Sequence, residues 1–372
     1  MANNLIPVGF KDDVTSDVTT EHIFKNKIID YFCSNGFDLV KTPLIEYFDK
    51  DMSKNVFTIS VKKNEEKLNI RSDITLQVAS LSKTRLSKKN KPLKLCYYGE
   101  VARKKGSMLR PERQFLQIGA ECIGEKNILA DVEMMELAYT SLSLVGIKNI
   151  IIEISSRVFF DKFIFSIKKS SQKNEILRLI RIKDLNGILK ILNKKNSQYI
   201  IDLFSCTGTY KDKKKFLKKL RIDTDTSNEI FNIEKIISIF LSRNKGAKIF
   251  LDLCEIADNH YHSGMRFTFF AENVRGEIAR GGRYQFKNMS RTDVGTGFTC
   301  YMDSILRASS SALNKKKIII PFNTSKNLTK ELVDKGFSLF RYTGNLNITK
   351  KLALHQNCQF YLSNNNVKKI IK

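Results

Sequence analysis

The sequence predicts an α+β fold, and three observations support that class. Between Leu93 and Gly124, apolar residues alternate in two runs, which predicts two strands joined by a long basic loop. Over Asp131–Leu144, apolar residues instead recur at helical spacing. Residues 157–245 show helical spacing almost throughout, with lysine-rich polar faces, so we expect a helical insertion between strand-rich parts.

The first part of the chain combines helices and strands. Thr19–Asn35 is predicted to be a helix that ends at Gly36, because its apolar residues recur at helical spacing: Ile23, Phe24, Ile28, Tyr31 and Phe32. The following run, FDLVKTPLIEY, predicts a strand broken at Pro43. A second helix is expected over Asp73–Lys83, and the apolar run Ile150–Ile154 predicts a short strand.

Strands return after the insertion, and the C-terminal part is small. Within the insertion, the stretch SCTGTYKD is expected to be a loop. We expect strands over Ala247–Cys254 and Met265–Ala271, and a close-packed turn at the double glycine of GGRY, Gly281–Tyr284. A small αβ remnant with one more apolar strand, IIIPF, is predicted at the C-terminal end. The predicted divisions are 1–156 and 246–313 for the core, 157–245 for the insertion and 314–372 for the remnant.

The composition limits the partners that this chain is expected to have. Its 372 residues carry a net charge of +26, which ordinarily suggests nucleic acid or another anionic surface. Lysine is dispersed along the chain, so we attribute the excess mainly to composition bias, with a functional basic surface as the alternative. Seven cysteines show no CxxC pair and no histidine at ligand spacing, which predicts free thiols, no metal and no cofactor. Without a targeting core or a spanning apolar run, we expect a cytoplasmic protein with no membrane contact.

One face of the two strands around the basic loop is polar and uncrowded. Alternation places Gln117, Gly119 and Glu121 on one face of the second strand, and Arg103 shares a face of the first strand with Gly99. An amide, a carboxylate and a guanidinium around bare glycines can hold a small zwitterion, since an ammonium needs a carboxylate and a carboxylate needs an arginine. A solvated sheet face is the alternative that periodicity leaves open.

This segment resembles motif 2 of class II aminoacyl-tRNA synthetases, most closely that of histidyl-tRNA synthetase. Ile70–Val78, IRSDITLQV, is similar to the LRPEGT segment of that synthetase, and Gly281–Leu306 is similar to its motif 3. Three motifs in the same order are a specific signal. The resemblance implies a class II synthetase-like antiparallel sheet flanked by helices. It also implies a homodimer through the motif 1 region, which corresponds to the helix and strand between Thr19 and Tyr47.

The resemblance also implies a histidine-binding pocket. The matching positions are Asp73 (glutamate in the family), Thr75, Arg103, Gln117, Glu121, Tyr261 and, at the second tyrosine of RGLDYYTG, His262. By charge type, Asp73 and Glu121 would hold the ammonium of histidine, Arg103 its carboxylate, and Gln117 or Tyr261 its imidazole. This assignment of roles is a hypothesis. The two histidines that flank Tyr261 have no ligand partners at metal spacing, so a metal site is not expected there.

The residues that would make an aminoacyl-adenylate are replaced. Making an aminoacyl-adenylate requires cations at the amino-acid carboxylate and at the ATP phosphates, because negative charge develops there during the transfer. The matching positions carry Ala257 in place of the RGLDYYTG arginine and Ser304 in place of the motif 3 arginine. Lys105 and Gln285 replace two family carboxylates. We therefore expect no catalytic residues and no enzymatic activity.

A synthetase-like core with a kept amino-acid pocket and no adenylation residues resembles the regulatory subunits of short-form ATP phosphoribosyltransferase. That resemblance implies a non-catalytic partner of the short catalytic subunit, required for the first step of histidine biosynthesis and for feedback regulation by L-histidine. The short C-terminal remnant is too small for a full anticodon-binding domain, and no specific nucleic acid is expected. An active histidyl-tRNA synthetase and an RNA-binding synthetase paralogue are the alternatives. The basic loop Lys104–Arg113 is either solvated or in contact with the partner.

Overall fold

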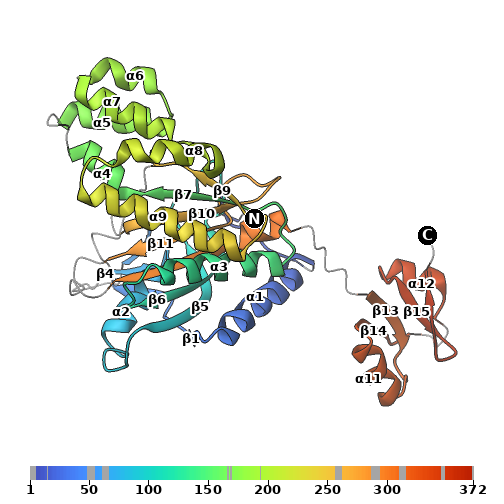
Figure 1. Cartoon of the computed structure of the whole chain (residues 1–372). Helices are drawn as coiled ribbons and strands as arrows, with labels where there is room; N and C mark the ends of the chain where they lie inside the picture. The colour runs from blue at the N-terminus through green and yellow to red at the C-terminus, as the bar shows by residue number, and fades with distance from the viewer. Residues whose placement is uncertain are drawn as a thin grey trace. The chain divides into compact units, whose positions relative to one another are not determined.

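The computed structural model contains two compact units, residues 1–311 and 312–372 (Figure 1). The structure describes residues 6–14, 16–47, 55–60, 67–165, 167, 170–192, 194–255, 262–285, 294–309, 316–344 and 348–370. The finer division of the first unit into two core parts and an insertion stays a prediction.

The first unit is built on a nine-stranded sheet with the order β1-β5-β6-β12-β11-β10-β7-β9-β8 among the described residues. Neighbouring strands from β5 to β7 in that order are antiparallel, while β1 and β9 pair in parallel at either side. The predicted antiparallel sheet of the α+β class is confirmed. The strands are β1 (Asp38–Val40), β5 (Leu93–Ala102), β6 (Gln114–Ile123), β7 (Ile151–Ser156), β8 (Gly208–Thr209), β9 (Lys248–Leu251), β10 (His262–Phe270), β11 (Ala279–Tyr284) and β12 (Gly295–Tyr301). A small antiparallel sheet joins β2 (Ile45–Tyr47), β4 (Lys67–Ile70) and β3 (Phe57–Ser60).

Helices cover the two faces of the large sheet differently. In Figure 1, α1 (Ser16–Ser34), α3 (Leu129–Leu144) and α9 (Thr224–Arg243) lie across one face. On that face, the ring of Phe32 meets Phe298 edge to face at 5.5 Å, and Asp131 accepts a hydrogen bond from Thr296. The opposite face is covered by α2 (Thr75–Lys83), whose Val78 packs in one cluster with Tyr97. The short helix α10 (Met302–Ala308) follows β12.

The segment between β7 and β9 is largely helical, as its periodicity predicts. It contains α4 (Arg157–Phe165), α5 (Ser170–Arg181), α6 (Leu185–Ile191), α7 (Lys194–Ser205), α8 (Tyr210–Leu217), a short 3-10 helix η2 (Lys218–Leu220) and α9. The expectation of a loop at SCTGTYKD is wrong in part. Gly208 and Thr209 form the edge strand β8 beside β9, and α8 begins at Tyr210. The pairing with β9 is long-range, so local sequence could not indicate it.

The GGRY stretch is also not a turn. It belongs to β11, which pairs with β10 on one side and β12 on the other. A side chain at Gly281 would meet the carbonyl oxygen of Gly297 at 2.3 Å and the ring of Phe267 at 2.5 Å. The glycine is therefore required by close packing inside the sheet and not by turn geometry.

The second unit has its own sheet and core. Its strands are β13 (Lys316–Pro321), β14 (Phe337–Tyr342), β15 (Phe360–Ser363) and β16 (Asn366–Lys369), in the order β14-β13-β15-β16. The parallel strands are connected through α11 (Lys326–Asp334) and α12 (Lys350–His355). Ile318, Ile320 and Leu332 are buried together in its core. The sequence predicted one strand here, at IIIPF, and missed β14, β15 and β16. Only IIIPF has a strong apolar signal.

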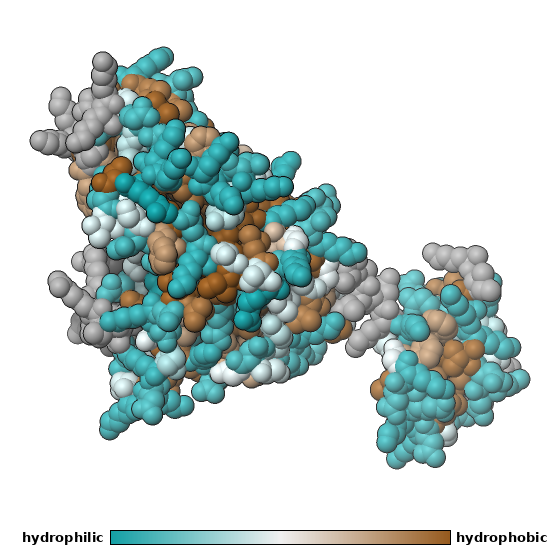
Figure 2. Space-filling model, viewed as in Figure 1, coloured by the Kyte–Doolittle hydropathy of each residue, from teal (hydrophilic) through white to brown (hydrophobic). Residues whose placement is uncertain are grey.

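Polar residues dominate the surface, and most thiols lie inside. Hydrophilic residues cover most of the face shown in Figure 2. Six of the seven cysteines are buried, and Cys33 on α1 is exposed. Within the described ranges, no helix is long and apolar enough to cross a membrane. The same ranges hold no group of three or more histidine, cysteine, aspartate or glutamate side chains that could bind a metal ion.

Candidate functional site

The face of the large sheet under α2 carries a continuous set of polar side chains. Strand pairing places Tyr97 of β5 opposite Gly119 of β6, and Gly119 opposite Thr299 of β12. Because paired residues point to the same face, these residues lie on the face that also presents Gln117 and Glu121. The structure thus brings the predicted residues of motif 2 to one surface, beside the start of α2.

The start of α2 places Asp73, Thr75 and Gln117 together. The Oδ1 atom of Asp73 accepts a hydrogen bond of 2.9 Å from the backbone N–H of Thr75. The Nε2 atom of Gln117 donates to Asp73 Oδ2 at 3.1 Å, and its Oε1 accepts from the backbone N–H of Ile74 at 3.1 Å. Both ends of the Gln117 amide are therefore used, which fixes its orientation and that of the Asp73 carboxylate.

Hydroxyl groups connect Thr75 to the buried end of the site. The Thr75 hydroxyl lies 3.0 Å from the hydroxyl of Tyr97, which lies 2.8 Å from the hydroxyl of Thr299. Tyr97 OH also donates to Glu121 Oε1 at 3.3 Å. Burial raises the pKa of Tyr97 well above its ordinary value, so this phenol keeps its proton and remains a donor.

Glu121 is the most buried charged-type residue of the predicted site, with 0% exposure. Tyr284 OH donates to its Oε2 at 2.8 Å. Burial raises the pKa of Glu121 to about 8; the hydroxyls of Tyr284, Thr75 and Tyr97 oppose this shift, and the Asp73 carboxylate adds to it. The side chain is therefore mostly a neutral carboxylic acid at pH 7. A side chain at Gly297 would lie 1.8 Å from Glu121 Oε2, so the glycine makes room for this carboxyl group.

Arg103 and the basic loop lie toward the other end of β6. Phe115 and Tyr301 meet edge to face with ring centroids 6.0 Å apart. The guanidinium of Arg103 is 4.9 Å from the Phe115 centroid, and that of Arg110 is 3.6 Å from the Tyr301 centroid. Arg110 is 6% exposed and forms ion pairs of 3.4 Å with Glu277 and Asp303. The basic loop is thus anchored by a buried cation, while its Met108 is fully exposed.

The remaining predicted positions are placed only in part. Tyr261 and Ala257 lie outside the described residues, and His262 is described only as the first backbone position of β10, opposite Tyr284. Ser304 is fully buried on α10, where its hydroxyl accepts from Arg307 Nη2 at 3.2 Å. Lys105 is exposed, and Gln285 is half-buried directly after β11.

Three residues of the site were missed by sequence reasoning: Tyr97, Tyr284 and Thr299. Tyr97 could have been found, because alternation places it on the same face as Gly99. Tyr284 was hidden by the interpretation of GGRY as a turn, and Thr299 is brought beside Tyr97 only by the pairing of β12 with β6.

A synthetase-type sheet with this polar face agrees with comparisons of the sequence. Residues 9–305 match the family described as Histidyl-tRNA synthetase.

The chain belongs to the histidyl-tRNA synthetase family.

The curated proteins that this chain resembles are not named histidyl-tRNA synthetase. An ATP phosphoribosyltransferase regulatory subunit from Rhodospirillum centenum is 27% identical over 340 residues, which cover 90% of this chain and 88% of the relative. The protein of the same name from Paramagnetospirillum magneticum is 26% identical and covers 87% of this chain and 86% of its own length.

Solved structures show the same fold. The crystal structure of an ATP phosphoribosyltransferase regulatory subunit/histidyl-tRNA synthetase from Bacillus halodurans has a TM-score of 0.81 and 19% identity, covering 97% of this chain and 98% of that one. Histidyl-tRNA synthetase from Nostoc sp. PCC 7120 has a TM-score of 0.76 and 18% identity, covering 98% and 92%. At these identities the structures establish the fold and not the activity.

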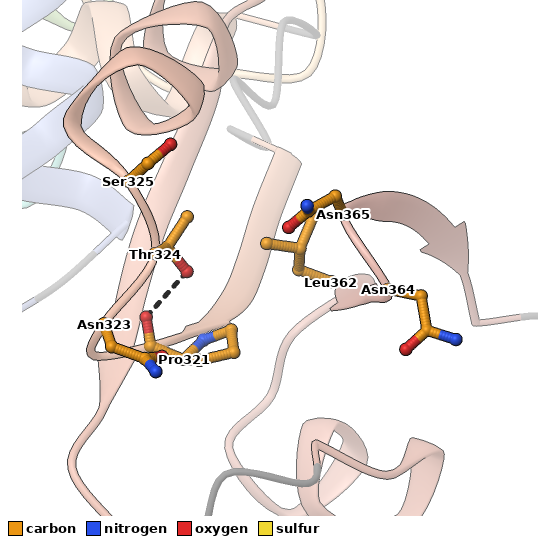
Figure 3. A pocket seen from close by; sticks show the side chains of 7 residues that line it. All are labelled: Pro321, Asn323, Thr324, Ser325, Leu362, Asn364 and Asn365. Atoms are coloured by element: carbon orange, nitrogen blue, oxygen red, sulfur yellow. Dashed lines mark hydrogen bonds between the residues drawn. The ribbon is translucent and has the colours of Figure 1, made fainter.

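A separate cavity lies in the second unit, at the C-terminal ends of β13 and β15 (Figure 3). It measures about 350 Å³, and its lining includes Thr324, Asn364 and Asn365. Figure 3 shows the Thr324 hydroxyl bonded to the carbonyl oxygen of Pro321, at 2.8 Å. The lining has no ionisable side chain, so this cavity lacks the charged groups expected of an amino-acid site.

Proposed function

We propose that this chain is the regulatory subunit of a short-form ATP phosphoribosyltransferase. The observation that carries the proposal is the likeness to curated proteins of that name over about nine-tenths of both chains. In this function the chain binds the short catalytic subunit in the cytoplasm and has no catalytic residue of its own. It supports the first step of histidine biosynthesis and lowers the activity of the assembly when L-histidine is bound, because a ligand that favours the inhibited state shifts the population toward it.

The polar face under α2 supports histidine as the ligand. Asp73, oriented by Gln117 and Thr75, is a suitable partner for the ammonium group. Glu121 suits the imidazole better than the ammonium, because a mostly neutral carboxylic acid gives little charge attraction but can donate one hydrogen bond and accept another. This changes the role first assigned to Glu121. Tyr261 and His262 stay candidate residues on the strength of the family resemblance.

The other end of the face supports the loss of adenylation. The position that matches the motif 3 arginine holds the buried hydroxyl of Ser304. With Ala257 at the other arginine position, two family cations are missing. The loss of one such electrostatic group typically costs about 3–4 kcal/mol of barrier, or roughly a hundred- to thousand-fold in rate.

A homodimer through the motif 1 region is part of the proposal. Among the described residues, β1 is an edge strand of the large sheet, and the nearby apolar side chains of Leu39, Ile45 and Tyr47 are exposed, Tyr47 by 71%. An unpaired edge with apolar neighbours suits a second copy of the chain.

The main experiment is reconstitution with the catalytic subunit. The purified chain should raise the rate at which the short catalytic subunit condenses ATP with phosphoribosyl pyrophosphate, and L-histidine should inhibit the assembly. Glu121→Leu, which removes both the donor and the acceptor of this side chain, should weaken that inhibition and leave activation by assembly largely intact. A chain that neither binds nor activates the catalytic subunit contradicts the proposal.

Two further assays test the alternatives, an active histidyl-tRNA synthetase and an RNA-binding synthetase paralogue. Histidine-dependent exchange of pyrophosphate with ATP should be absent, and robust exchange would establish an active synthetase. Binding to transfer RNA should be weak, without sequence preference, and should fall steeply with salt. Selective binding of one transfer RNA at physiological salt would instead favour the RNA-binding paralogue.

A further inference from the structure

The segment that carries Asp73 lies between the candidate site and another part of the first unit. It comprises residues 71–77, which follow β4 and enter α2, and we call it the Asp73 segment. Besides the bonds of Asp73 and Thr75 within the site, the carbonyl oxygen of Ser72 accepts a hydrogen bond of 3.5 Å from Arg103 Nε. One side of the Asp73 segment is therefore held by residues of the site.

The other side of the Asp73 segment contacts the stretch that leads from β1 into β2. Gln77 Nε2 donates to the carbonyl oxygen of Pro43 at 3.0 Å and to Glu46 Oε2 at 2.8 Å. Leu44 and Ile45 lie between these two acceptors, and each is 48% exposed on the surface that the proposed homodimer would bury. A change at that surface can therefore reach the Asp73 segment through direct contacts.

Arg71 makes the central connection between the two parts, and it is only 6% exposed. Its Nε donates to the carbonyl oxygen of Glu100 at 2.8 Å, and its Nη1 donates to Thr42 O at 3.0 Å and Thr42 Oγ1 at 3.1 Å. Its backbone N–H donates to Leu44 O and its carbonyl oxygen accepts from the N–H of Ala102, both at 3.0 Å. Because a buried guanidinium keeps its charge, it depends on these acceptors and holds them in place.

Gly99 of β5 provides the space that the side chain of Arg71 occupies. A Cβ atom at Gly99 would collide with Arg71 Nη2, so the glycine is required by the guanidinium. The floor at Gly99 is therefore not open to a ligand, in contrast to the expectation from the sequence. Burial lowers the pKa of Arg71, and the carboxylates of Glu46 and Glu100 oppose this shift. The carboxylates that support this cation thus belong to β2 and β5.

We propose that Arg71 couples the homodimer surface to the effector site, so that association of two copies and binding of the amino acid strengthen each other. A second copy packed against Leu44 and Ile45 orders the stretch between β1 and β2. Arg71 and Gln77 transmit that order to the Asp73 segment, which then presents its carboxylate to the ligand ammonium in one orientation. Arg71 is a positioning residue, because it acts through Asp73. This inference rests on the proposed function, with its homodimer and its histidine site.

The experiment measures self-association of the full chain by analytical ultracentrifugation, with and without L-histidine, and histidine affinity by calorimetry below and above the dimer dissociation constant. The wild-type dimer should bind histidine roughly 10-fold more tightly than the monomer. Saturating histidine should then lower the dimer dissociation constant by roughly 100-fold, because each dimer holds two sites and the coupling is reciprocal. A residue that only stabilises the fold would not change this ratio.

Two variants disturb the guanidinium in different ways. Arg71→Lys keeps the charge, but a single ammonium cannot reach the acceptors on β5 and those of Thr42 together. It should reduce the difference in histidine affinity between dimer and monomer to less than about 2-fold. Gly99→Ala should have the same effect by displacing the guanidinium while Arg71 itself is unchanged. Circular dichroism on each variant checks that it is folded.

Arg283→Lys is the matched control. Arg283 also donates to two backbone carbonyl oxygens, but its carboxylate partner is Asp131 of α3, on the face opposite the site. This variant should keep the full coupling, and its loss there would assign the effect to general destabilisation and not to Arg71. If Arg71→Lys keeps the full coupling, or if histidine leaves the wild-type dimer constant unchanged, the inference is wrong and the proposed function stands.

The wild-type chain alone separates the inference from the function on which it rests. A chain that binds histidine but does not associate with itself overturns the inference and removes the homodimer from the proposed function. A chain that associates but does not bind histidine overturns the inference together with histidine sensing at this site.

Discussion

The two ends of strand β6 bury charged-type groups in opposite ways. At one end, Glu121 is enclosed by tyrosine and threonine hydroxyls, and burial raises its pKa to about 8. At the other end, Arg110 is enclosed by the rings of Phe115 and Tyr301 and keeps two carboxylate partners. A carboxyl group can give up its charge when desolvated, whereas a guanidinium cannot and must be paired. The comparison shows that one strand supports both a neutral recognition end and an ionic anchoring end.

The largest effect is expected from the pH dependence at the Glu121 end. A folded-state pKa of about 8, above the ordinary value of 4.5, means that the folded chain holds a proton which the unfolded chain releases. Its contribution to stability is fully present below pH 4.5 and is lost as the pH rises through about 8, by at most about 5 kcal/mol. Glu121→Gln lacks this titrating group. In urea titrations, the free energy of unfolding of the variant should therefore rise relative to that of the wild type between pH 5 and pH 8.

Other buried carboxyls do not confuse that measurement. Burial also raises the pKa of Glu153 and of Glu21 to about 7, but both groups are present in the wild type and in the variant. Their contributions cancel in the difference between the two chains. A difference that stays constant from pH 5 to 8 would show that Glu121 is ionised in the folded chain.

The next largest effect is expected at the ionic end. Arg110→Met keeps an apolar side chain against Tyr301 but leaves Asp303, which is 6% exposed, with a weaker set of partners. Removing one partner of a buried pair costs about 3 kcal/mol. The free energy of unfolding in urea should fall by about that amount at pH 7. An unchanged value would mean that the loop is not anchored by this residue.

The fold and the site were predictable to different depths. Period-2 alternation is a local property of the chain, so it correctly placed Gln117 and Glu121 on one face. The burial of Arg110 depends on a ring 191 positions later in the chain and on carboxylates from a turn and a helix, and no local pattern contains that information. The prediction of a turn at GGRY was wrong for a related reason. Paired glycines usually indicate a turn, and only the neighbouring strands β10 and β12 make them a requirement for packing.

A smaller effect is expected from the hydroxyl that holds Glu121. Tyr284→Phe removes the 2.8 Å donor to Oε2 and leaves that acceptor buried without this bond. The expected loss is about 1–2 kcal/mol. Because this hydroxyl lowers the pKa of Glu121, its removal should raise that pKa further. Unfolding measured at pH 6 and pH 8 should show the larger loss at pH 8, where the carboxylate form needs the donor most.

The smallest effect is expected from the exposed part of the basic loop. Lys104→Met changes a cation on the same loop as Arg110, but Lys104 is exposed. Surface changes of this kind usually alter stability by less than about 0.5 kcal/mol. The same urea titration that tests Arg110→Met therefore provides its matched control. A loss as large as that of Arg110→Met would assign the anchoring to loop charge in general and not to the buried pair.

The distribution of cysteines makes thiol modification a direct measure of local unfolding in this chain. Only Cys33 is exposed, while burial raises the pKa of Cys122 and Cys206 to about 11, which suppresses their reactive thiolate form. A thiol reagent should therefore modify one site quickly in the native chain. Each later modification reports the opening of the part that contains that thiol. Since Cys358 belongs to the second unit and the other buried thiols belong to the first, the order of alkylation times the unfolding of the two cores independently.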